Sequence, residues 1–245
     1  MLRWLTQSTP RSTARFNKTF MDMTIYATEV AARLLPVGRS DGSAELLVAL
    51  LRELAKGRPV QLEALAAPLG WSAKQVAALL EQQPCTEYDG DGNVIGHGIT
   101  LNETPHAFEV NGRRLYTWCA LDALMFPVMI GTTVRVLSRC PATRLSVSLT
   151  VSPDEVRDVE PASAVVSLPL LDSAPNIRSS FCCHANFYAS ASAASPSIHQ
   201  GMELVCVEDA FRLGRLIADL LTAGTAEPPT ALSSDLLSQT RHANP

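Results

Sequence analysis

The sequence predicts an α+β protein in which a helical N-terminal module precedes a domain of antiparallel strands packed with helices. Apolar residues recur every three or four positions over residues 24–82, as they do in amphipathic helices. After residue 127, β-branched runs alternate with prolines, a pattern typical of strands and turns. With 245 residues, 47% of them hydrophobic, the chain is long enough for one large domain or two small ones.

Four helices are expected in the N-terminal module. The first is predicted over residues 24–36, the second begins at Ser43, and the third follows Pro59. The fourth opens with a capping box, in which Ser72 is followed three residues later by Gln75.

Two hairpins are predicted next. The turn sequence Asp-Gly-Asp-Gly-Asn at 89–93 separates strand-like segments at 86–88 and 94–101, and an Asn-Gly turn at 111–112 follows residues 108–110. The last three helices and the first hairpin together have the outline of a winged helix. Because winged helices often bind DNA, the charge of the module is used to test whether it could bind nucleic acid.

The charges argue against a nucleic-acid partner. Between residues 43 and 82, four basic side chains are balanced by four acidic ones, and the predicted fourth helix carries only Lys74. Phosphate contacts dominate DNA affinity, and this surface lacks them. The whole chain has a net charge of -4, and no apolar run approaches the roughly 18 residues of a membrane span, so no membrane partner is expected. Six irregularly spaced cysteines favour free thiols in a reducing, cytoplasmic location.

The rest of the chain is predicted to be rich in strands and to end in a helix. Strands are expected over 133–137, 146–151, 165–170 and 180–188, with a loop at 189–197 and a helix over 207–221. The predicted division has four parts: a disordered extension or spurious upstream start at 1–23, a winged-helix-like domain at 24–104, a strand–helix domain at 105–222 and a mobile tail at 223–245.

One thiol and one carboxylate lie three residues apart in the apolar stretch at 113–127. On a helix, Cys119 and Asp122 would share a face one turn apart and point together into the core. A nucleophile beside a proton carrier in a dry environment indicates chemistry, although a cysteine is also often a small buried hydrophobe.

A second thiol is expected opposite the first. In a strand over 180–188, side chains alternate between two faces, so Cys182 would lie on the polar face and Cys183 on the apolar, core face. Cys182 is therefore the cysteine expected to meet Cys119, unless both are buried spacers.

Three familiar uses of cysteine fit this sequence poorly. A structural zinc site usually needs C-x₂₋₄-C pairs and a redox disulfide favours C-x-x-C, and the sequence has neither. A papain-like protease needs a glycine and oxyanion context that is missing around Cys119. Two converging thiolates instead suit a soft cation such as Hg(II) or Cu(I), and a nearby carboxylic acid could protonate a carbon leaving group.

Two segments carry a specific family resemblance. Leu115-Tyr116-Thr117-Trp118-Cys119-Ala120-Leu121-Asp122 and Ser180-Phe181-Cys182-Cys183-His184 resemble the signature segments of bacterial alkylmercury (organomercurial) lyases. Residues 51–60, 87–89 and 147–153 also resemble that family, and the resemblance covers roughly residues 24–221. It implies a winged-helix-like part joined to a lyase domain of helices on antiparallel strands. It also implies an enzyme that splits an organomercurial into a hydrocarbon and Hg(II) without an added cofactor.

The resemblance also implies which residues perform the chemistry. Carried over by position, the catalytic set is Cys119, Asp122 and Cys182, with mercury bound by the two cysteines and the proton carried by the aspartate. Three aromatic residues beside this set are candidates for an apolar substrate pocket, or else plain core residues: Tyr116, Trp118 and Phe181.

The remaining cysteines have other expected roles. Cys140 matches a structural cysteine of the family, Cys183 matches a non-essential one, and Cys85 and Cys206 lie outside the motifs. The implied partners are the organomercurial substrate, low-molecular-weight thiols that assist product release, and mercuric reductase as the acceptor of Hg(II). Two rival hypotheses remain: a soft-metal carrier that breaks no bond, and a metal-responsive winged-helix regulator.

Overall fold

The structure is a computed structural model and describes residues 22–35, 42–83, 85–171, 176–199 and 201–223. The predicted extension at 1–23 and tail at 223–245 lie almost wholly outside these residues. Four helices come first: α1 (Met23–Leu34), α2 (Ser43–Leu54), α3 (Leu62–Leu69) and α4 (Ala73–Glu81). All four confirm the predicted helices. The capping box is also present, because the Gln75 amide donates to Ser72 Oγ while the Ser72 amide donates to Gln75 Oε1.

The larger sheet is antiparallel and has eight strands in the order β1-β2-β3-β5-β4-β6-β7-β8. The strands are β1 (Glu87–Tyr88), β2 (Val94–His97), β3 (Ile99–Thr100), β4 (His106–Val110), β5 (Arg113–Thr117), β6 (Val134–Arg139), β7 (Ser146–Val151) and β8 (Val156–Glu160). Both predicted hairpins, β1–β2 and β4–β5, are confirmed. Because β3 pairs with β5, the sheet runs continuously across the predicted domain boundary at residues 104 and 105.

A second, three-stranded sheet has the order β10-β9-β11, with β9 (Val165–Pro169) between β10 (Phe187–Tyr188) and β11 (Met202–Cys206). Three further helices complete the described part of the chain: α5 (Ala120–Ile130), α6 (Ala191–Ala194) and α7 (Val207–Thr222). The predicted C-terminal helix is therefore confirmed, whereas the expected loop at 189–197 contains α6 and a 3-10 turn at Ser195–Ser197.

The strand predicted over 180–188 is wrong for most of its length. Arg178–Cys182 forms a π-helical turn, closed by a bond of 3.0 Å from the Cys183 amide to the Arg178 carbonyl, and only Phe187–Tyr188 pairs as a strand. This turn satisfies its backbone groups locally, so it needs no neighbouring strand. The predicted orientation of the two cysteines is also wrong. Cys183 was expected to face the core, but it is exposed, and Cys182 is buried.

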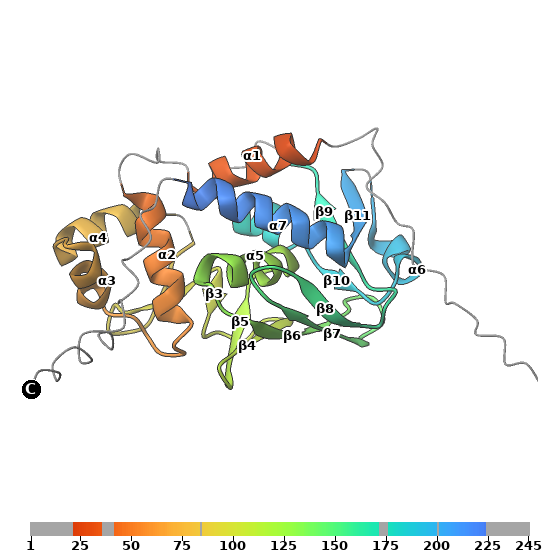
Figure 1. The fold of residues 1–245 in the computed structure, drawn as a ribbon, viewed down its shortest axis with the longest axis horizontal. Helices are drawn as coiled ribbons and strands as arrows, with labels where there is room; N and C mark the ends of the chain where they lie inside the picture. The colour runs from red at the N-terminus through yellow and green to blue at the C-terminus, as the bar shows by residue number, and fades with distance from the viewer. Residues whose placement is uncertain (1–21, 36–41, 84, 172–175, 200, 224–245) are drawn as a thin grey trace, which may run out of the picture.

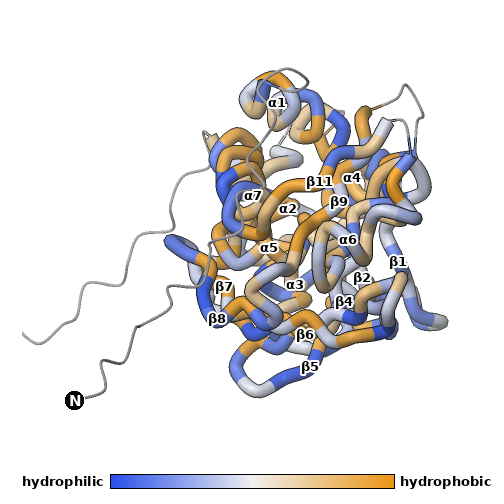
Figure 2. The backbone as a smooth tube through the Cα atoms, turned by 90° about the vertical axis from the view of Figure 1, so that its right-hand side faces the viewer, coloured by the Kyte–Doolittle hydropathy of each residue, from blue (hydrophilic) through white to orange (hydrophobic). Residues whose placement is uncertain are grey.

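Helices α5, α7 and α1 are stacked in successive layers above the large sheet, whereas α3 and α4 lie to one side of it (Figure 1). α7 lies between α1 and α5, and α5 lies between α7 and the sheet. Hydrophobic residues mark β9 and β11, which continue the core beside these helices (Figure 2). Nearly every residue of α5 is buried, as expected of a helix that is apolar on all sides. None of the described helices has the length and apolar character that a membrane span requires.

Candidate active site

Cys119 lies at the junction between strand β5 and helix α5, and not inside the helix. Its backbone is extended, with φ -148° and ψ 172°, and it is the N-cap of α5. The first helical amides lack partners within the helix, and a capping side chain is one group that can accept hydrogen bonds from them. Here the Cys119 sulfur accepts from the Asp122 amide at 3.4 Å.

Asp122 completes a capping box at the same helix end. Its Oδ2 accepts a hydrogen bond of 3.1 Å from the Cys119 amide, so each residue binds the backbone of the other. The predicted spacing therefore brings the thiol and the carboxylate together, although through a helix cap rather than through one turn of helix.

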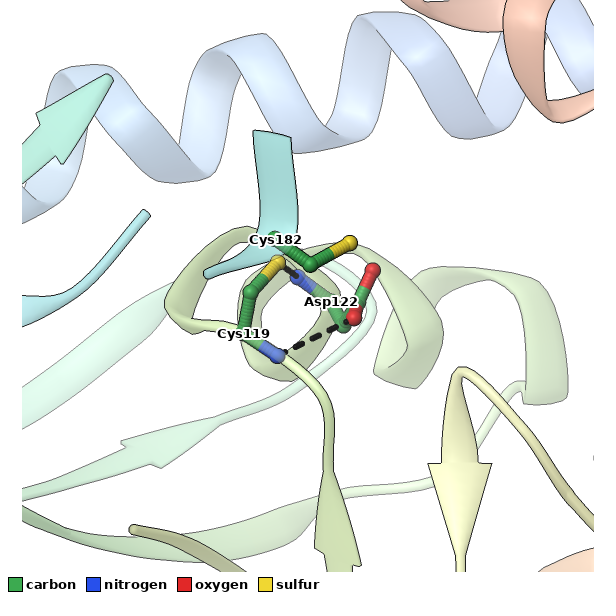
Figure 3. A group of neighbouring side chains, drawn as sticks. All are labelled: Cys119, Asp122 and Cys182. Atoms are coloured by element: carbon green, nitrogen blue, oxygen red, sulfur yellow. Dashed lines mark hydrogen bonds between the residues drawn. The ribbon is translucent and has the colours of Figure 1, made fainter. Parts of the chain in front are cut away.

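Cys182 enters the site from the π-helical turn. The Cys119, Asp122 and Cys182 ligand atoms all lie within 4.8 Å of one another. In Figure 3 both sulfurs and the carboxylate converge at the start of α5. A backbone bond of 2.9 Å from the Ala120 amide to the Ala185 carbonyl ties the two segments together beside the site.

The site is almost closed to solvent, and burial dominates its electrostatics. The exposed fractions of Cys119, Asp122 and Cys182 are 0%, 5% and 5%. Burial raises the pKa of Asp122 to about 7, although hydrogen bonds with Cys119 and the charge of Arg178 oppose the shift. Burial, helped by Cys182 and the Asp122 carboxylate, raises the pKa of Cys119 well above its usual value. The pKa of Cys182 is also raised: contact with the Cys119 thiol lowers it, but burial and the Asp122 charge outweigh that contact.

The three predicted pocket aromatics fall in different places. Phe181 is buried directly before Cys182, and Trp118 is partly buried directly before Cys119. Tyr116 is not at the site: its neighbours Leu115 and Thr117 face the core, so Tyr116 points to the outer face of the sheet. There it lines a shallow groove of about 440 Å³ with Arg139 and Arg144. The pocket role predicted for Tyr116 is therefore contradicted.

Cys140 and Cys206 are not part of the three-residue cluster. Cys140 is buried at the turn after β6, where its amide donates to the Leu145 carbonyl at 2.8 Å. Cys206 caps helix α7 much as Cys119 caps α5, because its sulfur accepts from the Asp209 amide at 3.4 Å. The Asp209 carboxylate, however, pairs with Arg212 at 2.9 Å, and no second cysteine or histidine joins this pair among the described residues.

Two residues around the site were not predicted from the sequence. Tyr26 of α1 is buried, its hydroxyl donates to the Pro169 carbonyl at 2.6 Å, and its ring centroid is 6.4 Å from that of Phe181. Arg178 lies on the π-helical turn of Cys182, with its guanidinium carbon 4.5 Å from the centroid of the Trp118 ring. The sequence signal for Arg178 is its position four residues before Cys182, and this spacing has no meaning when Cys182 is expected in a strand that begins at residue 180.

Comparisons with known proteins agree with this arrangement. A family model described as alkylmercury lyase matches residues 99–219, and one described as the helix-turn-helix domain of alkylmercury lyase matches residues 26–98. An alkylmercury lyase of Pseudomonas putida is 57% identical over 203 residues, which is 82% of this chain and 96% of the relative. An alkylmercury lyase of Streptomyces lividans is 42% identical over 208 residues, covering 82% and 97%.

A solved structure shows the same fold. It is titled the mercury-bound form of MerB2, and it matches with a TM-score of 0.68 and 21% identity over 80% of this chain and 99% of that one. Since the identity is low, this match concerns the fold alone. The sequence matches, by their length and identity, show the family as well as the fold. The chain belongs to the alkylmercury lyase family, and it is an enzyme of the lyase class.

Proposed function

We propose that this lyase cleaves the carbon–mercury bond of organomercurials by protonolysis, with Cys119 and Cys182 binding mercury and Asp122 carrying the proton. The observation that supports the proposal most is the convergence of two thiols and one carboxylate within 4.8 Å. Thiolates are the ligands that soft cations prefer, and a carboxyl group is a proton donor that needs no cofactor.

Mercury capture begins with thiol exchange. One of the two cysteines binds the metal of R–Hg–SR′, and its proton leaves on the displaced thiol R′SH. Asp122, as the carboxylate, then accepts the proton of the second cysteine, whose sulfur also binds mercury. Because burial raises the pKa of Asp122 to about 7, both of its protonation states are populated near neutral pH.

Bond cleavage follows from the same arrangement. Protonated Asp122 donates its proton to the carbon as the Hg–C bond breaks, and that bonding pair becomes the new C–H bond. The products are RH and Hg(II) held by two sulfurs, while Asp122 returns to the carboxylate. Two protons leave the enzyme thiols, one to R′SH and one to RH, so the reaction is balanced. Positioned general-acid catalysis contributes a factor of about 10²–10⁴.

Product release requires other thiols, because the two-sulfur complex is stable. We propose that low-molecular-weight thiols remove Hg(II) by exchange and that mercuric reductase is the eventual acceptor in the cytoplasm. No resident cofactor takes part in this scheme, and mercury enters only as substrate and product.

The test is hydrocarbon release from a defined organomercurial. The full-length chain is mixed with phenylmercury acetate and excess thiol, and benzene is measured in the headspace by gas chromatography. We expect one benzene per phenylmercury consumed. Retention of mercury without benzene would reject cleavage and would indicate a soft-metal carrier instead.

A further inference from the structure

Arg178 connects three elements that meet at the site. It lies on the π-helical turn that carries Cys182, and its backbone carbonyl closes that turn. Its side chain leaves the turn, and Nη1 lies 2.6 Å from Glu87 Oε1 on β1. Its guanidinium also lies against the Trp118 ring, 4.5 Å from the centroid. Arg178 thus links the turn that carries Cys182 to the residue before Cys119 and to the hairpin of the N-terminal module.

The Glu87 side chain is itself held in place. Its Oε2 accepts hydrogen bonds from Thr100 Oγ1 and from Asn102 Nδ2, the latter at 3.0 Å. Gly96 lies opposite Glu87 in the β1–β2 pair, and a Cβ there would overlap the carboxylate. The exposed fraction of the Glu87 side chain is only 13%. Arg178 therefore pairs with a fixed carboxylate and not with a mobile surface group.

Trp118 is the second fixed contact. Its amide donates to the Gly98 carbonyl at 3.0 Å, and its ring centroid lies 5.8 Å from that of His97 on β2. Trp118 directly precedes Cys119, so its position limits where the sulfur of Cys119 can lie. The hairpin β1–β2 thus supports both contacts of Arg178, through Glu87 on one strand and His97 on the other.

We propose that Arg178 is a positioning residue that holds the Cys182 turn at the separation from Cys119 that two-sulfur binding of mercury requires. The inference rests on the proposed function and adds a role for the hairpin of the helix-turn-helix module, which supports the active site. The Arg178 side chain is 38% exposed, so its ion pair contributes little to global stability. Its effect is on the geometry of the bound metal, as for other residues that orient metal ligands.

The experiment measures retention of Hg(II), which does not depend on bond cleavage. Mercuric chloride is bound to the full-length wild-type chain and its variants, and dithiothreitol is titrated in as competitor. The variants are Arg178→Met, which removes the charge and the fork of donors, Arg178→Lys, which keeps the charge, and Glu87→Gln. Arg212→Met is the matched control, because Arg212 forms an exposed ion pair of 2.9 Å at the cap of α7 and makes no ion pair with Glu87 and no ring contact with Trp118.

We expect Arg178→Met to weaken Hg(II) retention by about 10–100-fold, the usual effect of losing a residue that orients a metal ligand. Glu87→Gln should have a smaller effect, Arg178→Lys should recover part of the loss, and Arg212→Met should match the wild type. Tryptophan fluorescence should also change in Arg178→Met, because a cation leaves the Trp118 ring, but not in Arg212→Met.

Unchanged Hg(II) retention in Arg178→Met, or an equal loss in Arg212→Met, would overturn the proposal. Should Arg178→Met fail to fold, full retention in Glu87→Gln would overturn it instead. Failure of the proposed function is distinguishable, because a wild type that releases no benzene can still bind Hg(II) between its two sulfurs.

Discussion

Replacing Asp122 by asparagine should separate mercury binding from bond cleavage and should also stabilise the protein at pH 8. Asparagine has nearly the same shape, and its side-chain oxygen can still accept the hydrogen bond from the Cys119 amide. It neither titrates nor carries a proton to carbon. We expect benzene release to fall by about 10²–10⁴-fold, the usual contribution of a general acid, while Hg(II) is still bound.

The effect on stability follows from the pKa of the buried carboxyl. Burial raises the pKa of Asp122 from 3.8 to about 7. Because the folded state binds this proton more tightly than the unfolded chain, stability is lost as the pH rises from 3.8 to about 7. At about 1.4 kcal/mol per pH unit, the loss over this window is about 4 kcal/mol. Asparagine escapes this loss, so its advantage should grow by that amount across the window.

The assay is urea unfolding of both proteins at several pH values between 5 and 8, a range over which about 3 kcal/mol of the difference should develop. His97 and His106 also titrate on unfolding, because burial lowers the pKa of each to about 4 in the folded state. They are common to both proteins and cancel in the difference between the two free energies of unfolding. The matched control is Asp209→Asn, which removes a carboxylate at the equivalent position of the α7 cap.

Two results would refute this reasoning. A difference in the free energy of unfolding that stays constant with pH would mean that burial does not destabilise the Asp122 carboxylate. Full benzene release by the asparagine variant would remove Asp122 from the role of proton carrier. Asp209→Asn should show neither the growing difference nor the loss of activity.

Three further predictions test the surroundings of the site. Cys182→Ser should abolish benzene release and weaken Hg(II) retention, since one sulfur remains; normal turnover would exclude Cys182 from the mechanism. Cys206→Ser should leave benzene release unchanged, because its helix cap lacks a second thiol among the described residues; a large loss would show an unrecognised role. Tyr26→Phe removes the hydroxyl that donates to the Pro169 carbonyl and should lower the free energy of unfolding by about 1 kcal/mol in a urea titration; unchanged stability would argue against that bond.

Much of the fold could be predicted because local patterns determine it. The apolar periodicity located the four N-terminal helices and α7, and Ser72 with Gln75 marked the start of α4. Both hairpin turns were recognisable from their glycine and asparagine residues. Strand β8 was not predicted, because its largely exposed sequence depends on pairing with β7 and not on an apolar pattern.

The site was predicted in composition but not in conformation. Cys119 and Asp122 were expected to approach through helical spacing, and a capping box achieves the same result. Cys182 was placed by strand alternation, yet its position depends on a π-helical turn that no sequence period reveals. For Tyr116 the prediction was wrong about position. Its place in a signature segment suggested a pocket residue, but the alternation of side chains along β5 points it to the outer face of the sheet.

Helices α5 and α7 are both capped by a cysteine sulfur, and this similarity offers a way to detect metal binding through helix stability. In α5, the sulfur that caps the helix is also a proposed mercury ligand, and a thiolate accepts hydrogen bonds more strongly than a thiol. We therefore expect mercury binding by Cys119 to strengthen the hydrogen bond at the start of α5 when the thiol loses its proton. The Cys206 cap of α7 has the same geometry, but among the described residues no second thiol or histidine joins it, so its amides should exchange with solvent at the same rate in both states. Slower hydrogen exchange at the start of α5 alone would make the helix itself a reporter of mercury binding.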